Sequence, residues 1–425
     1  MKPMGPDAES KMQIAVTGLG CVTPCGNSAS ELWDALLQGK SGVARITHFP
    51  TERFSVDIAG ELKGFDPLST GVTKKEARRL THYVLWGLAS AQEAIAQAGL
   101  DTDSIPSERI GSIMGVGMGA LGPMEKEVLV LHKRGPSRVS PLLVPSGTPE
   151  VPPSEIARRY GFHGPSFSVS TACSSGSDAV IAALRCIQAG EVDVVIAGGA
   201  DQTVSELGLA TFANLGALAR RNGDPTTACR PFDRGRTGFV MGEGAGALVL
   251  ESVEHAKKRG AEILAVVSGY GQTTDAFHNT APDPSGVQAA RALRLALERS
   301  GLQPEDVSYI NAHGTSTQQN DPTETRAIKT ALGEAAYKVP VSSTKSMTGH
   351  MIGAAGAVEA IVAVQAIRYN AIPPTINYQD PDPECDLFYV PNEAIDAPVE
   401  AAMSNSFGFG GHNSSLLFRS AKSVQ

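Results

Sequence analysis

One short stretch of the chain combines a nucleophile with the kind of turn that would present it. From Ser166 to Leu184 the sequence reads SFSVSTACSSGSDAVIAAL, and small polar residues around Cys173 separate two apolar runs. We expect a strand followed by a buried helix that Cys173 opens. The partial positive charge and free N–H groups at a helix start lower a thiol pKa and can hold an oxyanion. A free cysteine is more often a small core side chain, and we expect Cys186 and Cys229 to be only that.

A nucleophile needs partners that move protons or stabilise charge. The segment NAHGTSTQQNDPTE (311–324) supplies His313 after an expected strand. The segment STKSMTGH (343–350) supplies Lys345 and His350 in the corresponding turn of a later repeat. A single histidine is usually structural, but two histidines and a lysine in polar turns at strand ends are hard to explain as core. The pattern therefore favours covalent catalysis at Cys173.

Glycine-rich motifs offer a weaker alternative, a nucleotide site. GMGALG (117–122) fits a dinucleotide fingerprint, but no acidic residue lies between Glu127 and Glu150 to bind a ribose. TGLGC (17–21) lacks the third glycine, and FVMGEGAGALVL (239–250) lacks the Lys-Ser/Thr of a phosphate-binding loop. We interpret all three as tight turns and close strand–helix packing, and expect no nucleotide cofactor.

Composition narrows the class of protein. The chain has 425 residues, 42% hydrophobic and 19% charged, with a formal net charge of −8. This is typical of a globular protein and disfavours nucleic acid as the main partner. Six scattered cysteines without a CxxC pair, and nine histidines without zinc spacing, predict no metal. We find no apolar run of the ~18–20 residues that span a bilayer and no signal peptide, and expect a cytoplasmic protein without a membrane partner.

Strand-like and helical runs alternate along the chain, which predicts an α/β fold with largely parallel, buried strands. We expect a strand at 14–18, a helix at 83–99, a strand at 110–115 and a strand–helix–strand unit over 166–199. Three segments recur in the same order, 94–115 in 295–314, 169–190 in 341–370 and 246–252 in 414–420. We therefore predict two similar halves, 12–261 with the cysteine and 262–420 with the His, Lys and His residues, packed around shared central helices.

Four motifs, TACSSG (171–176), NAHGTST (311–317), SSTKSMTGH (342–350) and NSFGFGGHN (405–413), together resemble those of elongating β-ketoacyl-[acyl-carrier-protein] synthases. The similarity runs over nearly the whole chain, from VTGLGCVTP (16–24) to the C-terminal motif. It implies a thiolase-like fold with a duplicated half and five layers, αβαβα. It also implies decarboxylative Claisen condensation of malonyl-carrier protein with a Cys-bound acyl chain. The partner is then acyl carrier protein, whose phosphopantetheine carries the substrates, and no further cofactor is needed.

The resemblance also assigns roles to individual residues. Cys173 would receive the acyl chain, and His313 and His350 would polarise the malonyl thioester. Lys345 would hold the geometry through an ion pair with Glu324. The other implied residues are the supporting acid Asp321, the oxyanion and gate residues Phe409 and Phe407, the pantetheine-binding Thr315 and Thr317, the acyl-pocket residues Met118 and Phe212, and the carrier-protein docking residues Lys74, Lys75, Arg78, Arg79, Arg138 and Arg220, which Arg221 follows. Alone, Met118 and Phe212 would pass as core residues, and a basic run is usually a solvated helix face.

The chain also departs from fatty-acid synthases. Two segments, QQND after HGTST and NYQDPDPECDLFYVPN (377–392), resemble those of stand-alone type II polyketide ketosynthases as much as those of fatty-acid enzymes. In SGTPEVPPSEIARRYG (146–161) we expect Pro149, Pro152 and Pro153 to break or delay a helix and force an extended path near a subunit interface.

Two assemblies stay open, a homodimer and a heterodimer with a homologous chain-length-factor-like subunit in a polyketide or polyene pathway. The retained Cys173 and its partners disfavour a non-catalytic partner subunit. The lack of a second C-terminal cysteine disfavours a thiolase-type enzyme that acts on CoA.

Overall fold

A single mixed sheet runs through the protein and organises everything else. The computed structural model describes residues 12–220 and 223–424, and in these the sheet has ten strands in the order β10-β9-β13-β14-β8-β1-β7-β6-β4-β5. The strands are β1 (Ile14–Val22), β4 (Ile110–Gly115), β5 (Ser166–Val169), β6 (Val194–Asp201), β7 (Gly244–Ser252), β8 (Ala265–Thr274), β9 (Tyr309–Asn311), β10 (Val341–Ser342), β13 (Ala401–Gly408) and β14 (His412–Arg419).

The sheet consists of two five-stranded sets with the same internal order. In the first set, β5, β4 and β6 are parallel neighbours, β7 pairs antiparallel with β6, and β1 pairs antiparallel with β7. In the second set, β10, β9 and β13 are parallel neighbours, β14 pairs antiparallel with β13, and β8 pairs antiparallel with β14. A short antiparallel pairing of β1 with β8 joins the sets. This shared order is the predicted duplication; the exact boundary at residues 261 and 262 stays a prediction.

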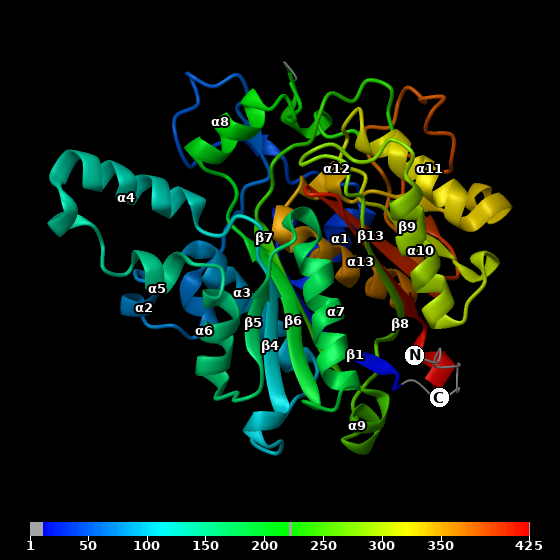
Figure 1. Ribbon diagram of the computed structural model, residues 1–425, viewed down its shortest axis with the longest axis horizontal. Helices are drawn as coiled ribbons and strands as arrows, with labels where there is room; N and C mark the ends of the chain where they lie inside the picture. Colours follow the sequence, from blue (N-terminus) through cyan, green and yellow to red (C-terminus); the bar gives the residue numbers. More distant parts are fainter. Residues whose placement is uncertain (1–11, 221–222, 425) are drawn as a thin grey trace.

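Helices complete five layers around the two strand sets (Figure 1). On the outer side of the first set lie α3 (His82–Gln97) and α6 (Val151–Tyr160), and on the outer side of the second lie α10 (Val287–Ser300) and α11 (Asn320–Leu332). Between the sets, α7 (Ser175–Gln188) and α13 (Ala355–Tyr369) contact each other and strands of both sets. The order is αβαβα, with a shared central helix layer, as expected.

Glycine lets the outer helices lie directly on the strands. A Cβ on Gly20 of β1 would stand 2.1 Å from the carbonyl oxygen of Ser90 in α3. On β8, the first strand of the second set, a Cβ on Gly271 would stand 1.8 Å from the carbonyl oxygen of Ala292 in α10. The same close packing thus occurs in both halves, and TGLGC is a packing motif rather than a nucleotide fingerprint. Strand β1, expected to end at Gly18, continues to Val22.

The segment with the unusual prolines forms helix, which corrects the expected extended path. Pro152 and Pro153 lie in the first turn of α6, where the missing N–H groups would have no intrahelical acceptor. Pro149 stands just before this helix and accepts a hydrogen bond from the Ser168 hydroxyl at 2.5 Å. The prolines therefore delay the helix to residue 151, and α6 packs on α3 and β5.

Within residues 12–220 and 223–424, one helix is long and apolar enough to cross a membrane, contrary to the expectation that no such run exists. The segment Ile352–Tyr369 has 18 residues and a mean hydropathy of 1.3, but 89% of it is buried inside the protein. It includes α13, which lies between the two strand sets. This apolar run is therefore a core helix.

The other elements connect these layers or extend from them. Figure 1 shows α4 projecting away from the body. The apolar residues Val128, Leu129 and Leu131 of this helix are exposed. These elements are α1 (Ala29–Leu37), α2 (Lys74–Ala77), α4 (Leu121–Arg134), α5 (Leu143–Gly147), α8 (Glu206–Asn214), α9 (Val253–Lys258), α12 (Lys345–Thr348), and the short strands β2 (Ala44–Arg45), β3 (Ile58–Ala59), β11 (Ala371–Ile372) and β12 (Ile395–Asp396).

Candidate active site

Cys173 lies where the sequence places it, in a 3-10 turn between β5 and α7. The polar residues around it brace this turn: the Thr171 hydroxyl donates to Asp178 at 2.6 Å, and the Ser175 hydroxyl accepts from the Thr171 N–H at 2.9 Å. Residues 179–181 on the following helix are fully buried. The small polar cluster thus satisfies the backbone of a turn that ends one strand and starts a core helix.

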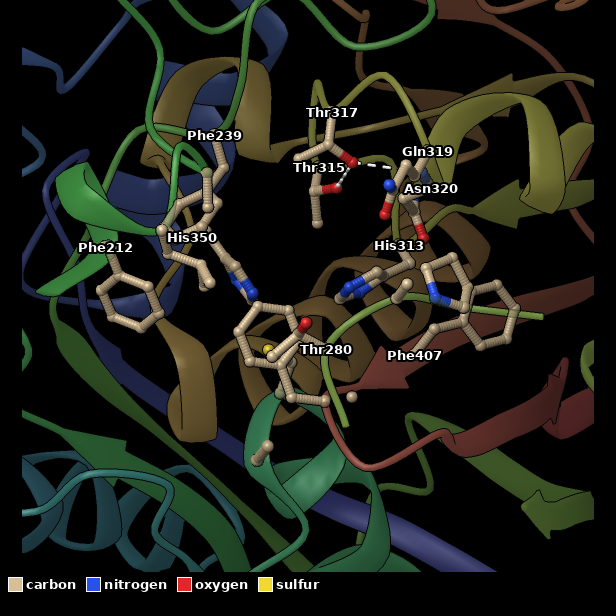
Figure 2. Close-up of a pocket in the computed structure, with 18 of the residues that line it drawn as sticks. Phe212, Phe239, Thr280, His313, Thr315, Thr317, Gln319, Asn320, His350 and Phe407 are labelled. Carbon is tan, nitrogen blue, oxygen red and sulfur yellow. Dashed lines mark hydrogen bonds between the residues drawn. The ribbon is translucent and has the colours of Figure 1, made fainter. Parts of the chain in front are cut away.

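Three chemically active side chains meet at this turn. His313 follows β9 and His350 follows α12, and both are buried. One ligand atom from each histidine and the sulfur of Cys173 all lie within 4.8 Å of one another. The two imidazole rings are 5.4 Å apart and nearly perpendicular, at 86°. Figure 2 shows both rings facing the same open space. The fold therefore brings Cys173 together with two histidines that lie 140 and 177 positions later in the chain.

Burial dominates the electrostatics of the cysteine, which corrects the expectation of a lowered thiol pKa. Desolvation raises the pKa of Cys173 to about 12, and a hydrogen bond from the Phe409 N–H and the charge of Lys345 only partly offset it. At neutral pH the thiol is therefore protonated, and a reaction at the sulfur needs a base that accepts its proton.

Both histidines are neutral at physiological pH. Burial and the nearby Lys345 charge hold the pKa of His313 and of His350 well below its usual range. Neither ring nitrogen of His350 has a hydrogen-bond partner, nor does Nδ1 of His313. A neutral imidazole can accept a proton at one nitrogen or donate one from the other. The free ring positions therefore leave these histidines available to a substrate.

Lys345 pairs with Glu359 of α13, which corrects the expected pairing with Glu324. Its ammonium group also donates to the main-chain oxygen of His313 at 2.7 Å. Glu324 instead accepts the main-chain N–H groups of His313 and Gly314 at 2.8 and 2.7 Å. The two acids thus have different roles: Glu359 neutralises the lysine, and Glu324 fixes the backbone that carries His313.

The cluster opens into a pocket of about 460 Å³. Met118, Phe212, Phe407 and Phe409 line it, as do Thr315 and Thr317, whose hydroxyl oxygens are 3.0 Å apart. Figure 2 shows Phe212 and Phe239 on the His350 side and the two threonines on another wall. The pocket therefore brings together apolar and hydrogen-bonding walls around the three reactive side chains.

Comparisons with known proteins show to which family the chain belongs. Residues 11–256 match the family model "Beta-ketoacyl synthase, N-terminal domain", and residues 264–379 match "Beta-ketoacyl synthase, C-terminal domain". The chain belongs to the β-ketoacyl synthase family. It is 46% identical over 409 residues to a 3-oxoacyl-[acyl-carrier-protein] synthase 2 of Synechocystis, covering 96% of this chain and 98% of the relative.

Solved structures of ketosynthases share the fold. One is a type II polyketide synthase (PKS) ketosynthase in complex with its acyl-carrier protein and bound to a hexaketide. Another is the ishigamide ketosynthase/chain length factor. Each superposes with a TM-score of 0.90 at 35% identity and covers 97% of this chain and 100% of its own. The thiolase-like fold of this β-ketoacyl synthase family is thereby established for the chain.

Other residues expected at the site lie at its edge or outside it. Asp321 does not line the pocket; it accepts the main-chain N–H of Phe232 at 2.8 Å and lies 3.8 Å from the Arg236 guanidinium. The docking residues on the described part of the chain have exposed side chains, and Arg221 lies outside the described residues. The exposed set is Lys74, Lys75, Arg78, Arg79, Arg138 and Arg220.

The expected core cysteines differ. Cys229 is buried, but Cys186 is only partly buried. Neither lines the pocket.

Sequence reasoning missed two acids that hold the site together. Glu359 stands alone in the apolar run AGAVEAIVAV (355–364), and a single acid in such a helix is a signal for a buried ion pair. Asp201 ends β6 and accepts the main-chain N–H groups of Gly117, Met118, Gly119 and Gly353 at 2.7–3.1 Å. The loop that resembles a phosphate cradle thus cradles a carboxylate of the protein itself.

Proposed function

We propose that the protein elongates acyl chains on acyl carrier protein by decarboxylative Claisen condensation, with Cys173 as the nucleophile. The observation that carries this proposal is the buried cluster of Cys173, His313 and His350 within 4.8 Å at the base of one pocket. Membership in the β-ketoacyl synthase family supports the reaction class. The roles below are assigned to this chain's own residues from their contacts.

In the first half-reaction the acyl group moves from the carrier thioester to the cysteine. The sulfur of Cys173 attacks the thioester carbonyl, its proton passes by way of a neutral histidine, and the pantetheine thiolate leaves as a thiol. The Phe409 N–H, already hydrogen-bonded to this sulfur, and the main-chain N–H of Cys173 are suited to hold the oxyanion. The close fit of Gly408, whose added Cβ would stand 3.2 Å from the Cys173 nitrogen, keeps these two segments together.

In the second half-reaction malonyl-carrier protein occupies the pocket. His313 and His350 donate hydrogen bonds to its thioester oxygen, so that loss of CO2 leaves the electron pair on a stabilised enolate. The enolate carbon attacks the acyl-cysteine, the new C–C bond forms and the cysteine sulfur leaves and regains a proton. Neutral imidazoles suit this task because they donate without needing protonation at neutral pH.

The pocket walls suit the two ends of the substrate. Thr315 and Thr317 offer hydroxyl groups to the pantetheine arm, and Met118 and Phe212 offer apolar surface to the acyl chain. We assign the role of gate to Phe409, which lines the pocket and whose ring centre lies 6.4 Å from that of Phe212. The chemistry draws on protein groups and carrier-bound substrates, and we expect no metal or nucleotide cofactor and a cytoplasmic location.

We propose that a second homologous chain and a carrier protein complete the assembly. Among the described residues, β5 is an edge strand of the sheet and exposes Phe167, and α4 exposes Val128 and Leu129; an unpaired strand edge and exposed apolar side chains suit contact with another subunit. A structure similar to this chain is described as a ketosynthase/chain length factor, which favours considering a heterodimer beside a homodimer. The exposed basic residues of α2 are suited to an acidic carrier protein.

Intact-protein mass spectrometry tests the proposal. The protein is incubated with acyl-carrier protein of several chain lengths, then with malonyl-carrier protein, and both half-reactions are followed as mass changes. We expect an acyl adduct on the wild type and on Cys186→Ala, none on Cys173→Ala, and a two-carbon extension that needs malonyl-carrier protein. An adduct on Cys173→Ala at the wild-type rate would overturn the nucleophile assignment. Native mass spectrometry of the chain expressed alone separates an active homodimer from a chain that needs a second subunit.

A further inference from the structure

The reactive cluster has the composition of a metal site that the condensing reaction does not use. A thiol and two imidazoles are the preferred ligands of Zn²⁺, and three protein ligands plus one open position are typical of an accessible zinc site. Cys173, His313 and His350 supply these three groups from three separate segments. The spacing of cysteines and histidines in the sequence gives no sign of this, because the segments meet only in the folded chain.

The distances are close to those that a metal ion needs. Around a tetrahedral Zn²⁺, with Zn–S of about 2.3 Å and Zn–N of about 2.0–2.1 Å, ligand atoms stand roughly 3.5 Å apart. Here they lie within 4.8 Å of one another. Side-chain rotations that move the ligand atoms by about 1 Å would close the difference. No hydrogen bond opposes such a rotation of His350, whose two ring nitrogens are buried without a partner.

The surroundings allow a cation to reach the cluster and stay there. All three residues line the open pocket, which gives a path from solvent. Lys345 contacts the main-chain oxygen of His313, but its charge is paired with Glu359, and Glu324 accepts the main-chain N–H of His313.

We propose that Cys173, His313 and His350 form a reversible inhibitory site for Zn²⁺ or a cation of similar softness. The bond that forms is sulfur to metal, the cysteine S–H bond breaks, and its proton goes to solvent, so no oxidant or reductant takes part. A water molecule or a small thiol completes the coordination. The ion occupies the position of the thioester carbonyl and blocks acylation, and a chelator restores the free cysteine.

Cobalt substitution tests the site without any enzyme assay. The full-length, chelator-treated protein is titrated with Co²⁺, whose thiolate bond gives a near-ultraviolet charge-transfer band, and then with Zn²⁺ in competition. We expect one equivalent with this band in the wild type and in the matched control Cys186→Ala, which changes a partly buried cysteine outside the pocket. The conservative variant Cys173→Ser should lose the band, and His350→Gln should weaken binding at least about tenfold.

Two further results decide the question independently of catalysis. Zn²⁺ should protect Cys173 from iodoacetamide, as read by mass spectrometry, and a chelator should restore alkylation. Prior alkylation should abolish the cobalt band. Unchanged binding in both Cys173→Ser and His350→Gln, or alkylation of Cys173 at full rate under saturating Zn²⁺, would overturn the metal site while leaving the condensing function untouched.

Discussion

The buried pair of Lys345 and Glu359 should be one of the most costly interactions in the protein to break. Their side chains are 1% and 2% exposed, so neither charge is screened by water. In the variant Glu359→Gln the ammonium group would keep only the His313 carbonyl oxygen and a neutral amide as acceptors. Removing one partner of a buried pair costs about 3–5 kcal/mol, because it leaves an uncompensated charge. We expect a loss of this size in the free energy of unfolding.

Urea denaturation of a double-mutant cycle measures this coupling. The cycle combines Glu359→Gln with Lys345→Met, and the double variant should be clearly more stable than the sum of the single losses, since it leaves no lone charge. Glu324→Gln is the matched control: Glu324 holds the main-chain N–H groups at His313 and Gly314, so it should couple more weakly to Lys345→Met. A stronger coupling of the lysine to Glu324 than to Glu359 would refute the reasoning.

Three further predictions concern the reaction. His313→Ala and His350→Ala should still become acylated but lose malonyl decarboxylation by about 10²–10³-fold each, measured as CO2 release; normal elongation in either variant would contradict its role. Because burial raises the pKa of Cys173, its thiolate fraction should grow about tenfold per pH unit. The rate of iodoacetamide labelling should therefore rise about 100-fold from pH 7 to 9, and a plateau below pH 8 would contradict this. Reversing the charges of the exposed basic cluster should raise the KM for carrier protein, and the effect should be smaller at high salt; the changes are Lys74→Glu, Lys75→Glu, Arg78→Glu and Arg79→Glu. An unchanged KM would mean that the cluster is only a solvated helix face.

The sequence allows the fold and the reactive residues to be predicted because both depend on local patterns. Strand, turn and buried helix around Cys173 follow from alternating apolar and small polar residues, and the recurrence of this pattern predicts the duplication. The partner of Lys345 depends instead on how α13 packs beside the turn after β9, and the sequence does not state which acid this packing brings to the lysine. The thiol pKa likewise depends on how completely the pocket excludes water, which no motif states.

The prolines of 149–153 show a different kind of error. A proline forbids only particular backbone positions, and the first turn of a helix is not among them. The same three residues therefore fit an interrupted path or a helix that starts at residue 151. The packing of α6 on α3 and β5 decides between these.

The duplication also explains why only one half carries a nucleophile at this turn. In each half, the 3-10 turn that precedes the central helix begins with a residue at positive φ, Ala172 at 53° and Ile352 at 48°, so Cys173 and Gly353 hold equivalent positions. The Gly353 N–H is bonded to Asp201, and a Cβ there would stand 2.3 Å from the Gly117 nitrogen. A side chain is excluded at residue 353 because the carboxylate-bound loop approaches its backbone. One strained turn thus presents the sulfur, and its twin anchors the pocket wall beside it.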